Sequence, residues 1–159
     1  MLEFVITMNK LTGIEEVEAT NWMNEAARVA VKGLCLRAKC GSVVVKNGKM
    51  IGQGYNSPPQ DNVENRMCDK DSCCCHAEWR AIIQALKENP NEIEGSQLYF
   101  TRVDDQGKLK KSGKPYCTVC SRLALDVGIS YFVLWHEEGI CSYPTNVYNL
   151  YSYQNSPKI

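Results

Sequence analysis

Two short segments of the chain carry side chains of the types that bind metals and transfer protons. The first is His76-Ala77-Glu78, and the second is Cys117-Thr118-Val119-Cys120. Each segment is expected to begin a helix directly after a loop. The N-terminal end of a helix stabilises anions such as thiolates, and a three-residue spacing places Cys117 and Cys120 on one helical face. The pattern therefore predicts a metal site formed by two helix starts.

One histidine and two cysteines match the donor set of a catalytic zinc site. A structural zinc ion takes four protein ligands, whereas a catalytic one has three and keeps a position open for water. Two thiolates neutralise the dication. Glu78 then stands beside the metal, where a carboxylate takes a proton from activated water and delivers it elsewhere. This combination is typical of hydrolytic deamination.

Three other interpretations of these residues do not involve catalysis by a metal. His76 and Glu78 could serve the end of a helix while the two cysteines are buried as small apolar residues. A non-catalytic zinc module would normally close its site with a fourth ligand and gives Glu78 no role. A thiol redox protein using Cys117 and Cys120 gives neither His76 nor Glu78 a role. Metal content separates the zinc module from the redox protein.

Length and composition indicate one globular domain. The chain has 159 residues, of which 44% are hydrophobic and 23% charged, so a disordered, collagen-like or coiled-coil chain is excluded. Eighteen Lys plus Arg balance eighteen Asp plus Glu, giving zero formal net charge. No overall field therefore draws the protein onto nucleic acid or an anionic membrane, and we expect neither as a partner.

The chain start and the cysteine content indicate a cytoplasmic protein. Residues 1–10 contain a short apolar run interrupted by Glu3, without the basic region or cleavage site of a signal peptide. No stretch approaches a membrane span. In a reducing compartment, the nine cysteines are expected to serve metal binding, catalysis or burial rather than disulfides.

Helical and strand patterns alternate along the chain. Asn47-Gly48 predicts a β-hairpin, Pro90 ends one helix and Gly128 ends another, while Thr12 and Glu15 form a candidate capping box. The expected helices span 21–36, 76–89 and 117–127, and the expected strands span 43–45, 50–55, 97–101 and 129–135. This order predicts an α/β domain in which helices cover the faces of a sheet.

Several segments are expected to lie outside this framework. Residues 56–72 should form an irregular loop, and residues 102–114 should form an exposed insertion. Within that insertion, Lys108, Lys110, Lys111 and Lys114 either contact a phosphate group or are simply solvated. We expect one domain over residues 1–159, with a core at about 20–136, an N-terminal extension at 1–19 and a C-terminal tail at 137–159.

The motifs in combination resemble the cytidine and deoxycytidylate deaminase superfamily of zinc-dependent nucleobase deaminases. The signature of that family is His-x-Glu followed by Pro-Cys-x-x-Cys. The resemblance runs from about Trp22 to Trp135 and is closest to the deoxycytidylate (dCMP) branch. The further segments that carry it are Gly41-Ser42-Val43-Val44-Val45, Gly54-Tyr55-Asn56 with Pro58, Cys73 to Cys75, and Gly128-Ile129.

This resemblance implies a three-layer α/β/α domain with a central mixed sheet, and a homo-oligomer. It implies His76, Cys117 and Cys120 as ligands of one catalytic Zn²⁺. It also implies Glu78 as the proton shuttle, Asn56 as a contact to the sugar or base, and the Ala77 N–H as a donor to the base carbonyl.

The activity that the resemblance implies is hydrolysis of dCMP to dUMP with release of ammonia. Other amino-bearing bases share the same core motifs, so guanine, tRNA adenosine and a riboflavin-pathway pyrimidine stay open as alternative substrates. A non-catalytic zinc-stabilised binding module is the alternative from outside the enzymes. A substrate that is a free nucleotide or nucleobase agrees better with the zero net charge than an RNA does.

The chain departs from the family pattern in two places. Tyr116 stands between Pro115 and Cys117, whereas relatives usually have proline immediately before the first cysteine. The segment 102–114 is also longer than is expected for compact members of the family.

A separate feature is a group of cysteines shortly before the first motif, at positions 68, 73, 74 and 75. A second, structural zinc ion at these cysteines, with His136 or Cys141 recruited, is one interpretation, and ordinary or redox-active thiols are the other.

Overall fold

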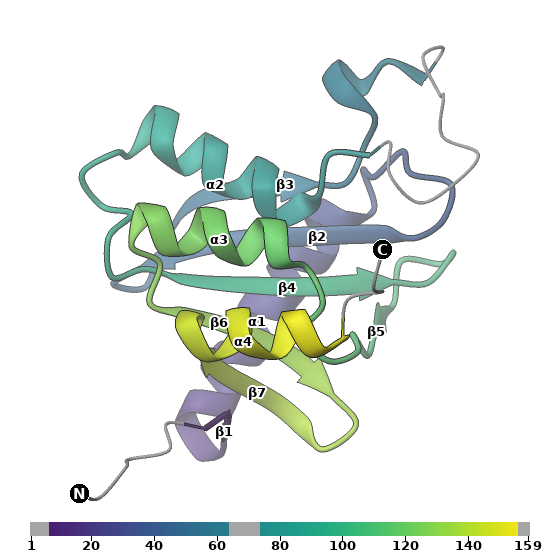
Figure 1. Ribbon diagram of the computed structural model, residues 1–159. Coiled ribbons are helices and arrows are strands. Elements are labelled where there is room, and N and C mark those ends of the chain that lie inside the picture. Colours follow the sequence, from purple (N-terminus) through teal and green to yellow (C-terminus); the bar gives the residue numbers. More distant parts are fainter. Residues whose placement is uncertain (1–6, 64–73, 156–159) are drawn as a thin grey trace, which may run out of the picture.

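A mixed β-sheet forms the middle layer of the protein (Figure 1). The computed structural model describes residues 7–63 and 74–155. In this part of the chain seven strands follow the order β1-β7-β6-β4-β2-β3, with β5 paired to β4. Only the β4–β6 pair is parallel among the pairs described. The strands are β1 (Asn9–Lys10), β2 (Lys39–Lys46), β3 (Lys49–Tyr55), β4 (Gln97–Val103), β5 (Leu109–Lys110), β6 (Tyr131–His136) and β7 (Gly139–Pro144).

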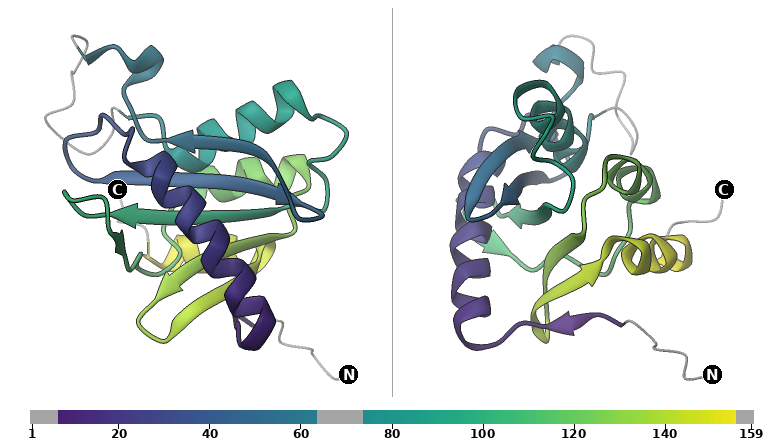
Figure 2. Two further views of the ribbon diagram at one scale, coloured as in Figure 1. Left: turned by 180° about the vertical axis from the view of Figure 1, so that it is seen from behind. Right: turned by 90° about the vertical axis from the view of Figure 1, so that its left-hand side faces the viewer.

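Helices cover both faces of this sheet. Helix α1 lies on one face, and α2, α3 and α4 lie on the other (Figure 1, Figure 2). Among the described residues, no helix combines the length and hydropathy that a membrane span requires. The helices are α1 (Gly13–Ala30), α2 (Ala77–Glu88), α3 (Thr118–Val127) and α4 (Thr145–Asn155), with a 3₁₀ turn η1 at Pro59–Asp61.

Each central strand sends successive side chains to opposite faces, so the core has two parts. Val44, Leu98 and Phe132 pack beneath α2, α3 and α4. Their chain neighbours, which include Val43 and Tyr99, pack beneath α1. Because both faces are covered, the sheet is a rigid platform for the loops and helix starts at its edges.

Glycines allow α2 to approach the sheet closely. A Cβ atom at Gly54 of β3 would lie 2.5 Å from both the carbonyl oxygen of Ala77 and the amide nitrogen of Ala81. Gly52, one pleat away, faces Ala81 and Ala85 in the same way. The start of α2 is therefore fixed by direct backbone contact with β3.

Most predicted elements are confirmed, and the hairpin most closely. Asn47 and Gly48 have φ angles of 49° and 72° and join β2 to β3, which is the left-handed conformation that this dipeptide favours. Helices α2 and α3 and strands β4 and β6 lie within two or three residues of their expected bounds. Residues 64–72 of the expected 56–72 loop lie outside the described residues.

The first helix was predicted in the wrong place. It runs from Gly13 to Ala30 instead of 21–36, because Ala19, Met23 and Ala26 continue the buried stripe toward the N-terminus. Thr12 does precede the helix, but its side chain makes no capping hydrogen bond, so the expected capping box does not form.

Two segments are more regular than the sequence indicated. The 102–114 segment is not simply an exposed insertion, since β4 continues to Val103 and pairs with β5 across a turn that Asp104 Oδ1 stabilises. Residues 139–155 form β7 and α4, which contribute Tyr143 and Tyr148 to the core. The division into core, extension and tail stays a prediction.

Candidate active site

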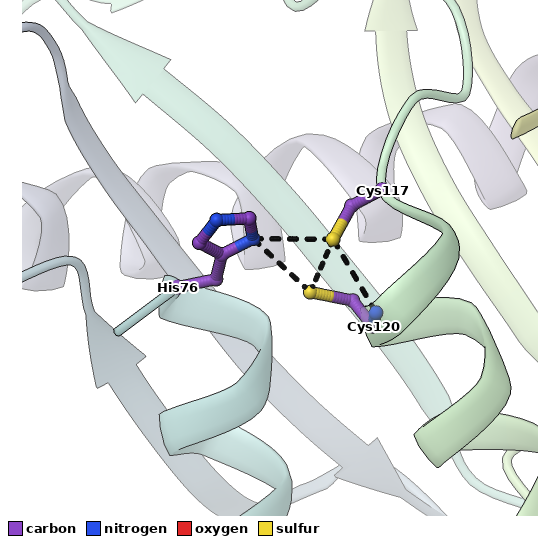
Figure 3. A group of neighbouring side chains, drawn as sticks. All are labelled: His76, Cys117 and Cys120. Atoms are coloured by element: carbon purple, nitrogen blue, oxygen red, sulfur yellow. Dashed lines mark hydrogen bonds between the residues drawn. The ribbon is translucent and has the colours of Figure 1, made fainter. Parts of the chain in front are cut away.

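The starts of α2 and α3 bring three metal-binding side chains together (Figure 3). His76 directly precedes α2, Cys117 directly precedes α3, and Cys120 lies in the first turn of α3. The His76 Nδ1 atom lies 3.1 Å from Cys117 Sγ and 3.3 Å from Cys120 Sγ. The two sulfur atoms are 2.8 Å apart. Residues more than forty positions apart thus form one cluster.

The sheet explains this convergence. Helices α2 and α3 lie side by side, and both begin near the carboxyl end of β4 (Figure 1). The Cys120 N–H donates to Cys117 Sγ at 3.3 Å, so this sulfur accepts one of the amide groups that a helix start leaves without a partner. Gly128, with a φ of 84°, ends α3 and sends the chain into β6. Both ends of α3 are thereby fixed.

The donor atoms fit a zinc ion. Among the described residues, His76, Cys117 and Cys120 form the group whose ligand atoms all lie within 4.8 Å of one another. Zinc binds imidazole nitrogen and thiolate sulfur at about 2.0–2.3 Å, so a single ion can reach all three atoms. Three protein ligands leave one position for water or substrate, which is the pattern of a catalytic rather than a structural site.

The electrostatics of the cluster favour metal binding. The hydrogen bond with Cys120 lowers the pKa of Cys117 to about 5, and His76 acts in the same direction. The same Cys117–Cys120 hydrogen bond raises the pKa of Cys120. The hydrogen bond with Cys117 raises the pKa of His76 to about 9. The lowered pKa favours the thiolate form of Cys117, which is the form of cysteine that binds metals.

Glu78 lies in the first turn of α2 and is only 5% exposed. Burial raises the pKa of Glu78 to about 7, and the charge of Cys117 adds to this rise while His76 opposes it. A carboxyl group with a pKa near neutrality can both accept and return a proton. Burial and a raised pKa are properties that a proton shuttle needs, and the assignment of Glu78 to this role stays a prediction.

The two expected substrate contacts differ in their surroundings. Ala77 is fully buried between His76 and Glu78, and its N–H belongs to the first turn of α2. Asn56 is also buried, but its side chain contacts the end of the α1–β2 loop and the start of β2. Oδ1 accepts from the Cys40 N–H of β2 at 2.8 Å, and Nδ2 donates to the Ala38 carbonyl of the loop at 2.7 Å. The structure thus gives Asn56 a role in holding that loop, and its contact with substrate stays a prediction.

The cysteines outside the cluster do not gather into a second group of three in the described chain. Cys68 and Cys73 lie outside the described residues. Cys74 shares a hydrogen bond with Cys35, a residue that the sequence did not single out. His136 contacts Tyr143 at 2.7 Å, and Cys141 is buried in the core. A second zinc ion therefore stays a hypothesis.

Sequence reasoning missed a network that holds the loop before α2. Arg80, one turn after His76, donates to Asp61 Oδ1 at 3.0 Å and to the Tyr55 carbonyl at 3.2 Å. The Tyr55 hydroxyl donates to Asp61 Oδ2 at 2.6 Å, and the Arg80 guanidinium stacks over the Tyr55 ring. The Gly-Tyr-Asn motif was the available signal, because it placed Tyr55 beside the site.

Comparison with known families identifies the chain. A family model described as the cytidine and deoxycytidylate deaminase zinc-binding region matches residues 17–135. The protein belongs to this family. Its deaminase fold, with a central mixed sheet between helices, is as the sequence predicted. Membership supports an enzyme of the deaminase class, and the His/Cys/Cys cluster together with the zinc-binding family region supports a zinc ion.

Solved structures of deaminases have the same fold. A dCMP deaminase from the cyanophage S-TIM5, in complex with dCMP and dUMP, is 25% identical, with a TM-score of 0.57 over 77% of this chain and 82% of that one. Its apo form, also 25% identical, gives a TM-score of 0.55 over 72% and 79%. A cytidine deaminase from Burkholderia pseudomallei, 17% identical, gives 0.57 over 81% and 94% and shows the fold alone. No curated protein sequence matches the chain significantly.

Proposed function

We propose that this deaminase hydrolyses dCMP to dUMP and releases ammonia, with a zinc ion held by His76, Cys117 and Cys120. The observation that carries the proposal is the buried carboxylate of Glu78 beside a three-ligand His/Cys/Cys cluster. The likeness to a phage dCMP deaminase crystallised with dCMP and dUMP supports this nucleotide over other bases.

Each residue of the site has a separate role in the proposed deamination. When bound, zinc supplies Lewis-acid activation of water. Glu78 accepts the proton of that water and delivers protons to the ring nitrogen and to the leaving amine. A bond from oxygen to C4 of the base forms, the C4–N bond breaks, and ammonia departs. The Ala77 N–H donates to the base carbonyl, and Asn56 contacts the sugar or base.

A substitution of Glu78 tests its role in proton transfer. Glu78→Gln keeps the shape of the side chain and all three zinc ligands but removes the proton acceptor. We expect unchanged zinc content and a turnover lower by about 10²–10⁴-fold. Glu88→Gln is the matched control, since Glu88 is exposed at the far end of the same helix. Retained turnover in Glu78→Gln would overturn the assignment.

We also propose that the enzyme is a homo-oligomer in the cytoplasm. Helix α2 leaves Trp79, Ile83 and Leu86 exposed at 40%, 39% and 37%. Their spacing of four and three residues places them on one stripe, and apolar surface of this kind favours association between copies. Light scattering of the wild type and of Ile83→Glu should show a larger mass for the wild type. Equal masses would contradict an interface at this stripe.

A further inference from the structure

Helix α4 contacts the segment that carries both cysteine ligands. It lies alongside α3 on the same face of the sheet (Figure 1, Figure 2). Four of its side chains have polar contacts with residues 115–121, and they recur at positions 148, 149, 152 and 155. This spacing places them on one face of the helix.

The residues that α4 contacts lie directly before or directly after Cys117 and Cys120 in the sequence. Asn155 Nδ2 donates to the Pro115 carbonyl at 2.9 Å. Tyr148 is buried, and its hydroxyl group lies close to the backbone of Tyr116. Thus the two residues that lead into Cys117 are both held from α4.

Two buried hydroxyl groups continue this contact into α3. Ser152 Oγ lies 3.2 Å from Thr118 Oγ1, and Ser121 Oγ lies 2.9 Å from Asn149 Oδ1. Ser121 and Ser152 are both fully buried. Each hydroxyl group also lies within hydrogen-bond distance of a carbonyl oxygen of its own helix, at 3.0 Å for Ser121 and 2.7 Å for Ser152. The contacts between α3 and α4 therefore add to partners that each helix supplies itself. The residues directly after Cys117 and Cys120 are thereby held in place.

The extra residue Tyr116 explains why such support is needed. A proline directly before the cysteine would fix its own φ angle and restrict the chain at the metal ligand. Here Pro115 lies one residue earlier, and the φ angle of Tyr116, next to Cys117, is not fixed by a ring. Contacts from α4 to the backbone of both residues restrict this freedom.

We propose that the polar face of α4, formed by Tyr148, Asn149, Ser152 and Asn155, positions Cys117 and Cys120 for the metal. These are positioning residues, since none of them belongs to the cluster itself. The inference rests on the proposed zinc site. It assigns a function in metal binding to the C-terminal helix, which lies outside the 17–135 family region.

Two substitutions with matched controls test the proposal. Tyr148→Phe removes one hydroxyl but keeps the ring that stacks on Phe132. Its control is Tyr143→Phe, which removes a buried hydroxyl that contacts His136 instead of residues 115–121. Asn155→Ala removes the contact with Pro115, and Asn146→Ala, at an exposed position of the same helix, is its control.

The readouts are the zinc dissociation constant from chelator competition, the visible spectrum of the Co²⁺-substituted protein, and the melting temperature. Loss of a partner behind the metal ligands typically weakens metal binding by about 10–100-fold. We expect about tenfold weaker zinc binding and altered Co²⁺ bands for Tyr148→Phe and for Asn155→Ala. Both controls should stay within about twofold of the wild type.

The outcomes separate this inference from the proposed function. If the wild type binds zinc and both test variants bind it equally well with the same Co²⁺ spectrum, α4 only stabilises the fold, and the inference is wrong. A lower melting temperature without weaker zinc binding would still mean that α4 only stabilises the fold. If the wild type binds no zinc, the inference and the proposed function fail together.

Discussion

Replacing Gly54 with alanine should displace the end of α2 that carries His76 and Glu78. The new Cβ atom would lie 2.5 Å from the Ala77 carbonyl oxygen, whereas ordinary van der Waals contact begins at 3.4 Å. The obstacle is backbone on both sides, so rotation of a side chain cannot relieve it. Helix α2 must therefore move away from β3 by about 0.9 Å.

The expected magnitudes follow from that displacement. Overpacking of this kind costs about 1–3 kcal/mol of unfolding free energy. For a chain of this length, each kcal/mol lowers the melting temperature by about 2–4 °C. A misplacement of about 1 Å at a catalytic group can cost about 100-fold in rate. We expect Gly54→Ala to melt several degrees lower and to release ammonia from dCMP about 100-fold more slowly.

Thermal unfolding and an ammonia-release assay measure both effects. Gly113→Ala is the matched control, because no atom lies within 4 Å of a Cβ at Gly113 and its φ is not positive. That variant should behave as the wild type. If Gly54→Ala has wild-type melting and wild-type turnover, the contact between β3 and α2 does not position the site.

Three further predictions concern the metal, the pH and a helix end. Chelation of zinc should lower the melting temperature and stop ammonia release, and zinc but not magnesium should restore both. Burial lowers the pKa of His136 below the unfolded value of about 6.5. The stability that neutral His136 contributes is therefore present above about pH 6.5 and is lost as the pH falls through the folded pKa. His136→Asn should flatten the urea-unfolding profile below about pH 6.5. Gly128→Ala places a side chain at a φ of 84° and should cost about 1–2 kcal/mol in urea unfolding. A pH profile unchanged by His136→Asn, or an unchanged midpoint for Gly128→Ala, would contradict the respective reasoning.

Local signals made much of the fold and the site predictable. Asn47-Gly48 adopts positive φ angles at little cost, so the β2–β3 hairpin could be placed from two residues. Pro90 and Gly128 marked the ends of α2 and α3. The motifs at His76 and Cys117 each lie at a helix start, as expected, and the sheet brings them together.

The rest depends on contacts between distant segments. The polar side chains of α4 contact α3 only in the folded protein, and no local sequence pattern predicts that α4 lies against α3. Strand β5 has only two residues, and it is a strand because it pairs with β4. The contacts of the Asn56 side chain with Ala38 and Cys40 arise because the α1–β2 loop and the start of β2 fold against it, while its contact with substrate stays a prediction. Tertiary contacts of this kind cannot be read from residue spacing.

The most direct test of the central claim is zinc content and ammonia release measured on one purified sample. The substrates are dCMP, cytidine, deoxycytidine, guanine and a tRNA pool. We expect at least one zinc ion per chain and ammonia release that is fastest with dCMP. A protein without zinc, or one that holds zinc and releases ammonia from none of these substrates, would contradict the account.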